Sequence, residues 1–305
     1  MSCRPGISRA DYPLTRNGTL NAIMSNSEAP AVEAHLEWDG GVAAARKWKK
    51  QAAVSGRPTN EALIDLAQIS AGMKVLDLAS GSGHPALDIA RVVGPAGHVT
   101  ATDLSSKLLA VAEEKAAEEE VSNISFREVD MENQPFPDET FDVVTCRLGI
   151  MYARNVEQAL REMRRVLKPG GRVGLVAWGP DKDDPRKTTV LNVLMKYSKS
   201  STPDSSVALG SSFSEPGKLS RALSQAGFRR VYEETRNIPF PFPGSPEQAW
   251  DLVQDGAILF QNMIKGLTPE DRKLAGIEIA DVWKKYYDGH HTTFTSPVVL
   301  ASGTR

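Results

Sequence analysis

The chain has 305 residues, a formal charge of -2 at pH 7 and a hydrophobic content of 41%, which fits a globular protein and argues against a dedicated nucleic-acid binder. Two cysteines are too few for a disulfide framework or a thiolate zinc site, so no metal is expected. No apolar run approaches the roughly 20 residues that span a bilayer, and residues 1–30 have no signal-peptide core. We therefore predict a cytoplasmic protein without a membrane span.

The N-terminal part is predicted to be a tail followed by helices. Residues 1–30 are rich in Ser, Asn, Arg and Pro and lack periodicity, which is typical of a disordered tail. Two separate helical patterns follow, at 32–53 and 59–69. We expect 31–70 either to pack on the main domain or to form a helical lid, in which Trp38 closes over a ligand.

From residue 71 onward, strand and helix patterns alternate. An apolar strand around Asp77 leads into the turn Gly81-Ser82-Gly83, and a helix follows. Further strand patterns lie at 98–103, 124–129, 141–146 and 172–178, and helical patterns lie at 86–93, 105–120 and 156–167. This alternation predicts an α/β fold with a doubly wound sheet.

The C-terminal part has two more strand patterns with helical residues between them. The strands are expected at 229–237 and 292–302. We therefore predict an α/β core at 71–240, a helical insertion at 241–291 that serves as a substrate cap, and a final core strand within 292–305.

Three polar features at strand ends predict one ligand site. Gly81 and Gly83 let a ligand approach the backbone and aim amide N–H groups at it. Asp103 ends the next strand, where an ionised carboxylate suits the two hydroxyls of a ribose. Asp130 and Met131 follow the third strand and suit the amino group and ring face of an adenine. Carboxyl ends of parallel strands meet at one sheet edge, where such folds bind ligands.

The glycine turn alone leaves two ligands open. Gly81, Gly83 and Ala86 also fit a dinucleotide fingerprint, and Asp103 lies at the distance expected for a nicotinamide ribose, so an NAD-dependent oxidoreductase is an alternative. A dinucleotide site needs no second acid at Asp130, however. Asp77, four residues before Gly81, is predicted either to orient the turn or to reach an amino acid group through water.

Five sequence motifs carry a family resemblance. They are VLDLASGSG, VTATDLS, FREVDMENQPFPDETFDVVTC, KPGG and RVGLVAW. Over about 60–180 the chain resembles class I S-adenosylmethionine-dependent methyltransferases, in particular the ubiquinone/menaquinone C-methyltransferase-like (type 11) group of small-molecule enzymes. The resemblance implies a Rossmann-like sheet of seven strands with helices on both faces.

The resemblance also implies S-adenosyl-L-methionine as the cofactor and a set of positions that contact it. These positions are Asp77, Ala79, Gly81, Ser82, Gly83, Asp103, Leu104, Asp130, Met131, Cys146 and Arg147, the last two through backbone groups. Ala79 departs from the family pattern, which has glycine there. His84 also departs, and we expect it to be an exposed residue at the start of a helix and not a catalytic base.

Direct displacement of a methyl group from a sulfonium requires positioning of the acceptor more than it requires a base. No catalytic residue is therefore predicted. The candidates to contact a small-molecule acceptor are Trp38, Met151, Tyr152 and Trp178, although Met151 and Tyr152 also fit core positions. A cofactor-binding enzyme of natural-product biosynthesis that catalyses a reaction other than methylation is a second alternative. The pattern of the sequence does not predict an oligomeric state.

Overall fold

The structure, a computed structural model, describes residues 41–197, 212–256 and 260–305. These residues belong to one unit, Ala34–Arg305. The expected tail at 1–30 and the candidate Trp38 lie outside the described residues.

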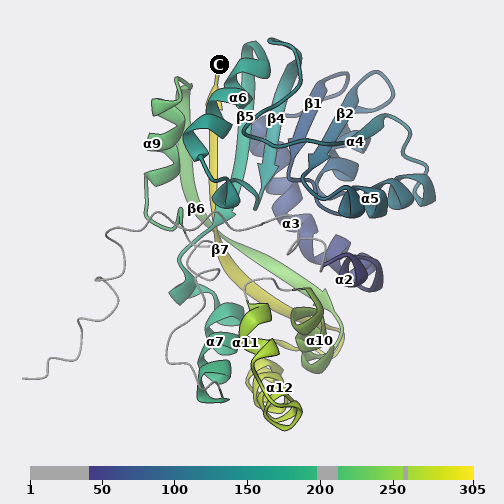
Figure 1. The fold of residues 1–305 in the computed structure, drawn as a ribbon, viewed down its shortest axis with the longest axis vertical. Coiled ribbons are helices and arrows are strands. Elements are labelled where there is room, and N and C mark those ends of the chain that lie inside the picture. Colours follow the sequence, from purple (N-terminus) through teal and green to yellow (C-terminus); the bar gives the residue numbers. More distant parts are fainter. Residues whose placement is uncertain (1–40, 198–211, 257–259) are drawn as a thin grey trace, which may run out of the picture. The chain divides into compact units, whose positions relative to one another are not determined.

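Seven strands form one sheet. The parallel strands are β1 (Lys74–Leu78), β2 (His98–Asp103), β3 (Ile124–Glu128), β4 (Phe141–Arg147) and β5 (Leu167–Trp178). The antiparallel strands are β6 (Arg229–Pro243) and β7 (His291–Thr304). The order β3-β2-β1-β4-β5-β7-β6 confirms the prediction of a doubly wound, seven-stranded α/β sheet (Figure 1).

Helices cover both faces of the sheet. They are α3 (Lys49–Ala67), α4 (Ala86–Val93), α5 (Ser106–Glu118), α6 (Val156–Val166) and α9 (Lys218–Gln225). α6 and α9 pack on one face around Leu76 and Leu175. α3 and α4 pack on the other face around Val75. The apolar strands are therefore buried from both sides, as expected for parallel strands.

The predicted gap between the two N-terminal helical patterns is absent. α3 runs without interruption through Gly56 and Pro58. A proline inside a helix removes one backbone hydrogen bond and costs about 3 kcal/mol. α3 packs against β5 and β6, where Leu63 and Ala67 are fully buried, and this tertiary contact offsets the cost.

The last two strands are longer than predicted. β5 ends at Trp178, which pairs with Val298 of β7. β6 and β7 continue beyond that point as a two-stranded ribbon, from Asn237 paired with Pro297 to Pro243 paired with His291. β6 is the edge strand of the sheet, so its prolines remove no hydrogen bond from a neighbour on the outer side.

The ribbon carries a second group of helices, which we name the cap. It consists of α7 (Pro185–Tyr197), α10 (Pro246–Gly256), α11 (Gln261–Lys265) and α12 (Pro269–Trp283). These helices gather around the far part of the β6–β7 ribbon in Figure 1 and share a core of their own around Trp283 and Phe294. α7 was not predicted, because its run of β-branched residues from Thr188 to Val190 obscures the helical pattern.

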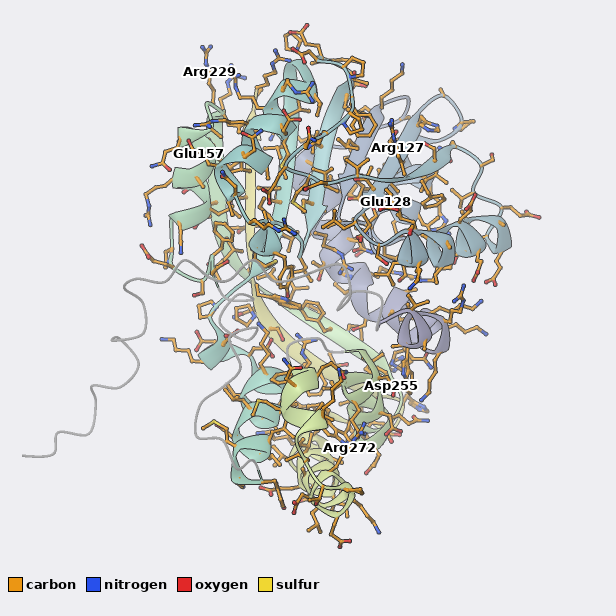
Figure 2. All side chains as sticks on the ribbon, in the orientation of Figure 1. Arg127, Glu128, Glu157, Arg229, Asp255 and Arg272 are labelled. Carbon is orange, nitrogen blue, oxygen red and sulfur yellow. The ribbon has the colours of Figure 1, made fainter. Side chains whose placement is uncertain are left out.

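A short helix, α2 (Val42–Lys47), precedes α3 and connects the sheet domain to the cap. Arg46 forms an ion pair of 2.6 Å with Glu114 of α5. Trp48 is buried in the cap core, and its Nε1 donates a 2.8 Å hydrogen bond to Asp255 of α10, which is labelled in Figure 2. None of the helices described is both long and apolar enough to cross a membrane.

Candidate functional site

The glycine turn lies at the carboxyl end of β1. Gly81 and Gly83 have φ values of +52° and +106°, which residues with a side chain rarely adopt. A Cβ on Gly83 would meet Ala112 of α5 at 3.1 Å, whereas a Cβ on Gly81 would meet nothing within 4 Å. Gly83 thus permits close packing of α5, and Gly81 leaves open space beside the backbone.

Asp103 joins the second predicted feature to this turn. Its Oδ2 accepts a 2.8 Å hydrogen bond from the Gly81 N–H, and its Oδ1 accepts one of 3.0 Å from the Ser105 N–H. Burial raises the pKa of this half-buried carboxyl, although the backbone donors act in the opposite direction. The ends of β1 and β2 are therefore held together by a carboxylate that retains further acceptor capacity.

Asp77 is fully buried below the turn. Its Oδ1 accepts a 2.6 Å hydrogen bond from the Thr145 hydroxyl, and its Oδ2 accepts one of 2.7 Å from the Ser80 hydroxyl. Burial raises the pKa of Asp77 to about 6 in spite of these two donors. This arrangement fits the first of the two predicted roles, orientation of the turn.

The raised pKa of Asp77 has a consequence for stability. The folded protein binds a proton at Asp77 more tightly than the unfolded chain does. Protonated Asp77 therefore contributes to the stability of the fold at pH 3.8, and this contribution is lost as pH rises to about 6. In Asp77→Asn the group no longer titrates. We expect its unfolding free energy, relative to the wild-type protein, to increase by roughly 2–3 kcal/mol between pH 4 and pH 6. Urea unfolding across this range measures the difference, and parallel profiles of the two proteins would contradict the prediction.

Ala79 stands where the family pattern has glycine. It has a φ of +55°, and a Cβ on the facing Gly149 would come within 2.4 Å of the Ala79 Cβ. The alanine therefore occupies a left-handed conformation, which costs an L residue about 1–2 kcal/mol. Gly149, in turn, has no room for a side chain.

Replacement of Ala79 by glycine is expected to stabilise the protein by about 1 kcal/mol, because it removes this backbone strain. Thermal unfolding measures the change. Ala110→Gly, at an exposed position in α5, serves as the control and should destabilise by about 1 kcal/mol. A loss of stability in both variants would show that the Ala79 backbone is not strained.

The remaining predicted cofactor positions surround the same edge. Asp130 is exposed, with Oδ1 accepting a 2.9 Å hydrogen bond from the Glu132 N–H, and Met131 and Leu104 are half-buried. Cys146 is fully buried in the sheet core, where burial raises the pKa of its thiol. Only the backbone of Cys146 is therefore placed to contact a ligand.

Lys115 was not predicted from the sequence. It lies in α5 and supports the turn Gly81-Ser82-Gly83. Lys115 is only 3% exposed, and its Nζ donates a 2.8 Å hydrogen bond to the carbonyl oxygen of Ser82. Burial lowers the pKa of this amine to about 8. A signal existed: Lys115 follows Ala112 by three residues, so the two share a helix face, and Ala112 packs against Gly83.

The acceptor-side candidates are not all in one place. Met151 is buried in the core beneath α6, so its side chain occupies a packing position. Burial raises the pKa of the half-buried Tyr152 to about 12, with a further contribution from Asp181. Trp178, at the end of β5, lies against Phe240 with ring centroids 5.6 Å apart.

Charged residues at the start of α7 cover Trp178. Arg186 and Lys187 place their cationic groups 5.0 Å and 4.6 Å from its ring centroid. Lys187 is 6% exposed, and its Nζ lies 2.7 Å from Asp181 Oδ1. Through Asp181 this group also neighbours Tyr152, so two of the predicted residues belong to one polar aromatic cluster.

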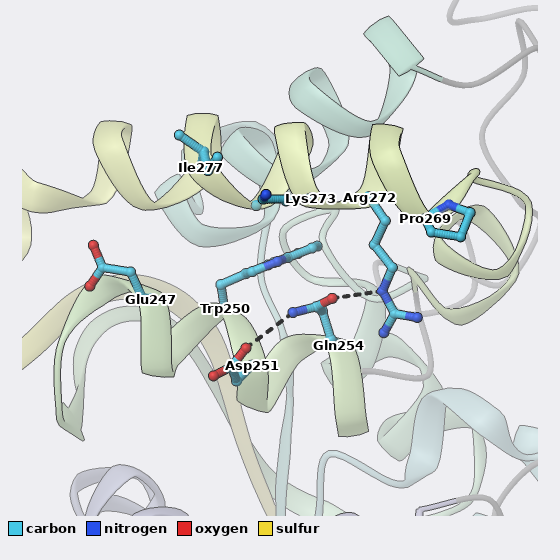
Figure 3. Close-up of a pocket in the computed structure, with 9 residues that line it drawn as sticks. Glu247, Trp250, Asp251, Gln254, Pro269, Arg272, Lys273 and Ile277 are labelled. Atoms are coloured by element: carbon cyan, nitrogen blue, oxygen red, sulfur yellow. Dashed lines mark hydrogen bonds between the residues drawn. The ribbon is translucent and has the colours of Figure 1, made fainter.

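A surface pocket of about 360 Å³ lies elsewhere, between α10 and α12. Figure 3 shows Gln254 of α10 between Asp251 and Arg272, with a 2.7 Å hydrogen bond from Arg272 Nε to Gln254 Oε1. None of the predicted site residues lines this pocket. The candidate site therefore remains the edge formed by the ends of β1, β2 and β4.

The fold and this edge define a class of protein. Residues 69–188 match the family described as a methyltransferase domain. This match confirms the resemblance on which the sequence-based prediction rests.

Particular relatives agree with this assignment. The ubiquinone/menaquinone biosynthesis C-methyltransferase UbiE of Pseudomonas aeruginosa is 41% identical over 111 residues, which cover 36% of this chain and 43% of the relative. The chain thus matches less than half the length of this curated relative.

Solved structures share the fold. The YcgJ protein of Bacillus subtilis superposes with a TM-score of 0.52 at 22% identity, over 81% of this chain and 97% of that one. Phosphoethanolamine N-methyltransferase 2 of Haemonchus contortus, solved in complex with S-adenosyl-L-methionine, gives a TM-score of 0.51 at 16% identity, over 87% and 57%.

Proposed function

We propose that the chain is an S-adenosyl-L-methionine-dependent methyltransferase that acts on a small-molecule acceptor by direct methyl displacement. The observation that carries this proposal is the junction of Gly81 and Asp103. It combines open space at a glycine backbone with a carboxylate at the end of the next strand. The match to a methyltransferase domain supports the same ligand.

The described residues fit this cofactor. Asp103 would hold the ribose hydroxyls, and Asp130 with Met131 would meet the adenine edge and face. The turn from Ala79 to Gly83 would lie along the methionine part. The cofactor supplies the electrophilic methyl group, and the protein contributes orientation and exclusion of water.

The C-methyltransferase relatives support an organic small molecule as the acceptor. A cofactor-dependent reaction other than methylation remains the alternative within this fold. NAD-dependent oxidation is disfavoured, because a match to a methyltransferase domain covers the whole glycine-turn region. The cytoplasmic location of the protein is a prediction from the sequence.

Isothermal titration calorimetry tests the cofactor. We expect S-adenosylhomocysteine and S-adenosylmethionine to bind and NAD not to bind. Binding of NAD alone would overturn the assignment. With the correct acceptor, release of S-adenosylhomocysteine should match product formation, and turnover without its release would favour the alternative reaction.

A further inference from the structure

A cluster of polar side chains lies beside the glycine turn, on the side of the sheet covered by α3. His84 follows the turn directly, and its Nδ1 lies 3.1 Å from Asp88 Oδ2. Asn60 of α3 donates to the same Asp88 oxygen at 2.6 Å. Arg147, the last residue of β4, donates a 3.4 Å hydrogen bond to the His84 carbonyl oxygen and lies against Gly56. Three elements thus contribute to one polar group.

Several atoms of this cluster have no hydrogen-bond partner within the described part of the chain. They are His84 Nε2, Arg147 Nε and Asn60 Oδ1, all inaccessible to solvent. The His84 side chain is 10% exposed, so the expectation of an exposed helix-start residue is not met. A buried polar atom without a partner costs about 1–3 kcal/mol, so each such atom calls for an explanation, and a catalytic role is one of them.

The partners of His84 define which nitrogen can accept a proton. The carboxylate of Asp88 favours a proton on Nδ1, which leaves the Nε2 lone pair free. Asp88 is held in place by Asn60 and by Arg91 at 3.2 Å. Burial acts to raise the pKa of Asp88, but the hydrogen bond from His84 and these neighbours lower it overall, so the carboxylate stays ionised. A carboxylate that orients an imidazole in this way is the usual arrangement of a general base.

Arg147 adds a positive charge next to this base. Burial lowers its pKa, while Asp77 and Asp88 raise it. Neither carboxylate forms an ion pair with Arg147 within 4.0 Å among the described residues, since both make hydrogen bonds to other groups. A guanidinium with unsatisfied donors suits an anionic oxygen.

We propose that His84, oriented by Asp88, is the general base of the proposed methyl transfer, and that Arg147 stabilises the oxygen anion of an acceptor with an acidic hydroxyl. This inference rests on the proposed function. The acceptor O–H bond breaks, and its proton moves to His84 Nε2. The electron pair of the resulting anion forms the new bond to the methyl carbon as the S–CH₃ bond breaks, leaving a thioether. The imidazolium then releases its proton to solvent.

The test uses 4-nitrophenol as the probe, because its absorbance reports whether the hydroxyl is ionised. When 4-nitrophenol is bound to the wild-type protein together with S-adenosylhomocysteine, its pKa is expected to be about one unit or more below that of unbound 4-nitrophenol. The shift should be lost in His84→Asn and Arg147→Met, and Arg147→Lys, which keeps the charge, should retain part of it. Circular dichroism confirms that each variant is folded.

Two exposed residues away from the site provide matched controls. His98→Asn and Arg161→Met should leave both the phenol shift and the affinity for S-adenosylhomocysteine unchanged. His84→Asn and Arg147→Met should also bind S-adenosylhomocysteine within about threefold of the wild-type protein. A tenfold or greater loss in Arg147→Met would assign the guanidinium to the cofactor carboxylate and overturn the proposal.

The remaining outcomes separate the two proposals. Binding of S-adenosylhomocysteine without saturable binding of 4-nitrophenol, or with an unshifted spectrum, overturns the role of His84 and Arg147 only. A wild-type protein that does not bind S-adenosylhomocysteine overturns the proposed function itself.

Discussion

Asp103→Asn is expected to weaken S-adenosylhomocysteine binding about 100-fold. The carboxylate already accepts the Gly81 and Ser105 N–H groups, and the proposed cofactor adds two ribose hydroxyls to it. An amide keeps the shape but replaces one acceptor oxygen by a donor, which then faces another donor. A hydrogen bond to a charged group contributes about 1.5–3 kcal/mol, and a loss of about 2.8 kcal/mol corresponds to a 100-fold weaker affinity. Calorimetric titration measures the dissociation constant directly.

Asp142→Asn is a matched control at the opposite edge of the sheet. Asp142 lies at the start of β4, where its Oδ2 accepts a 2.8 Å hydrogen bond from the Lys74 N–H and its Oδ1 one of 2.6 Å from Lys168 Nζ. This variant loses comparable hydrogen bonds but should bind S-adenosylhomocysteine like the wild-type protein. Equal losses of affinity in both variants would mean that Asp103 acts only through stability, and an unchanged affinity in Asp103→Asn would remove it from the site.

The parallel strands β1 to β4 could be predicted closely because turn residues bound each of them, whereas β5 begins at Leu167, before its predicted start at 172. The strand 98–103, for example, is found at the predicted residues. The N-terminal helix could not be predicted in the same way. Local propensity places a break near Pro58, and only packing on β5 and β6 makes a continuous helix favourable. The predicted strand at 229–237 is shorter than β6 for a similar reason, since prolines weaken a strand pattern unless the strand lies at an edge.

The site shows the same division. Asp103 follows a strand directly, so its place at the sheet edge depends only on chain order and strand direction. Lys115 and Asn60 reach the site from helix faces, and the helices must first be docked before their neighbours are known. His84 is adjacent to the glycine turn in sequence, but its role depends on Arg147, which approaches from β4. Contacts of this kind have no local sequence pattern.

Trp283→Ala is expected to destabilise the cap by about 3–5 kcal/mol and to leave cofactor binding nearly unchanged. Trp283 is fully buried at the end of α12, and its ring lies 4.8 Å from that of Phe294 in β7. Removal of a buried tryptophan leaves a large cavity. The cap has its own core, separate from those beneath the sheet, so the loss should produce local unfolding.

Hydrogen exchange with and without S-adenosylhomocysteine measures this separation. In Trp283→Ala, amides of α7, α10 and α12 should exchange faster, whereas those of β1, β2 and β4 should keep wild-type rates, because these strands pack in different cores. Met163→Ala, a fully buried position of α6 in the sheet core, is the control and should accelerate exchange in β4 and β5. Uniformly faster exchange in Trp283→Ala would show that the cap and the sheet unfold as one cooperative unit. In that case the bridge from Trp48 to Asp255 couples the cap to the cofactor edge, and S-adenosylhomocysteine should slow exchange in α12 as well.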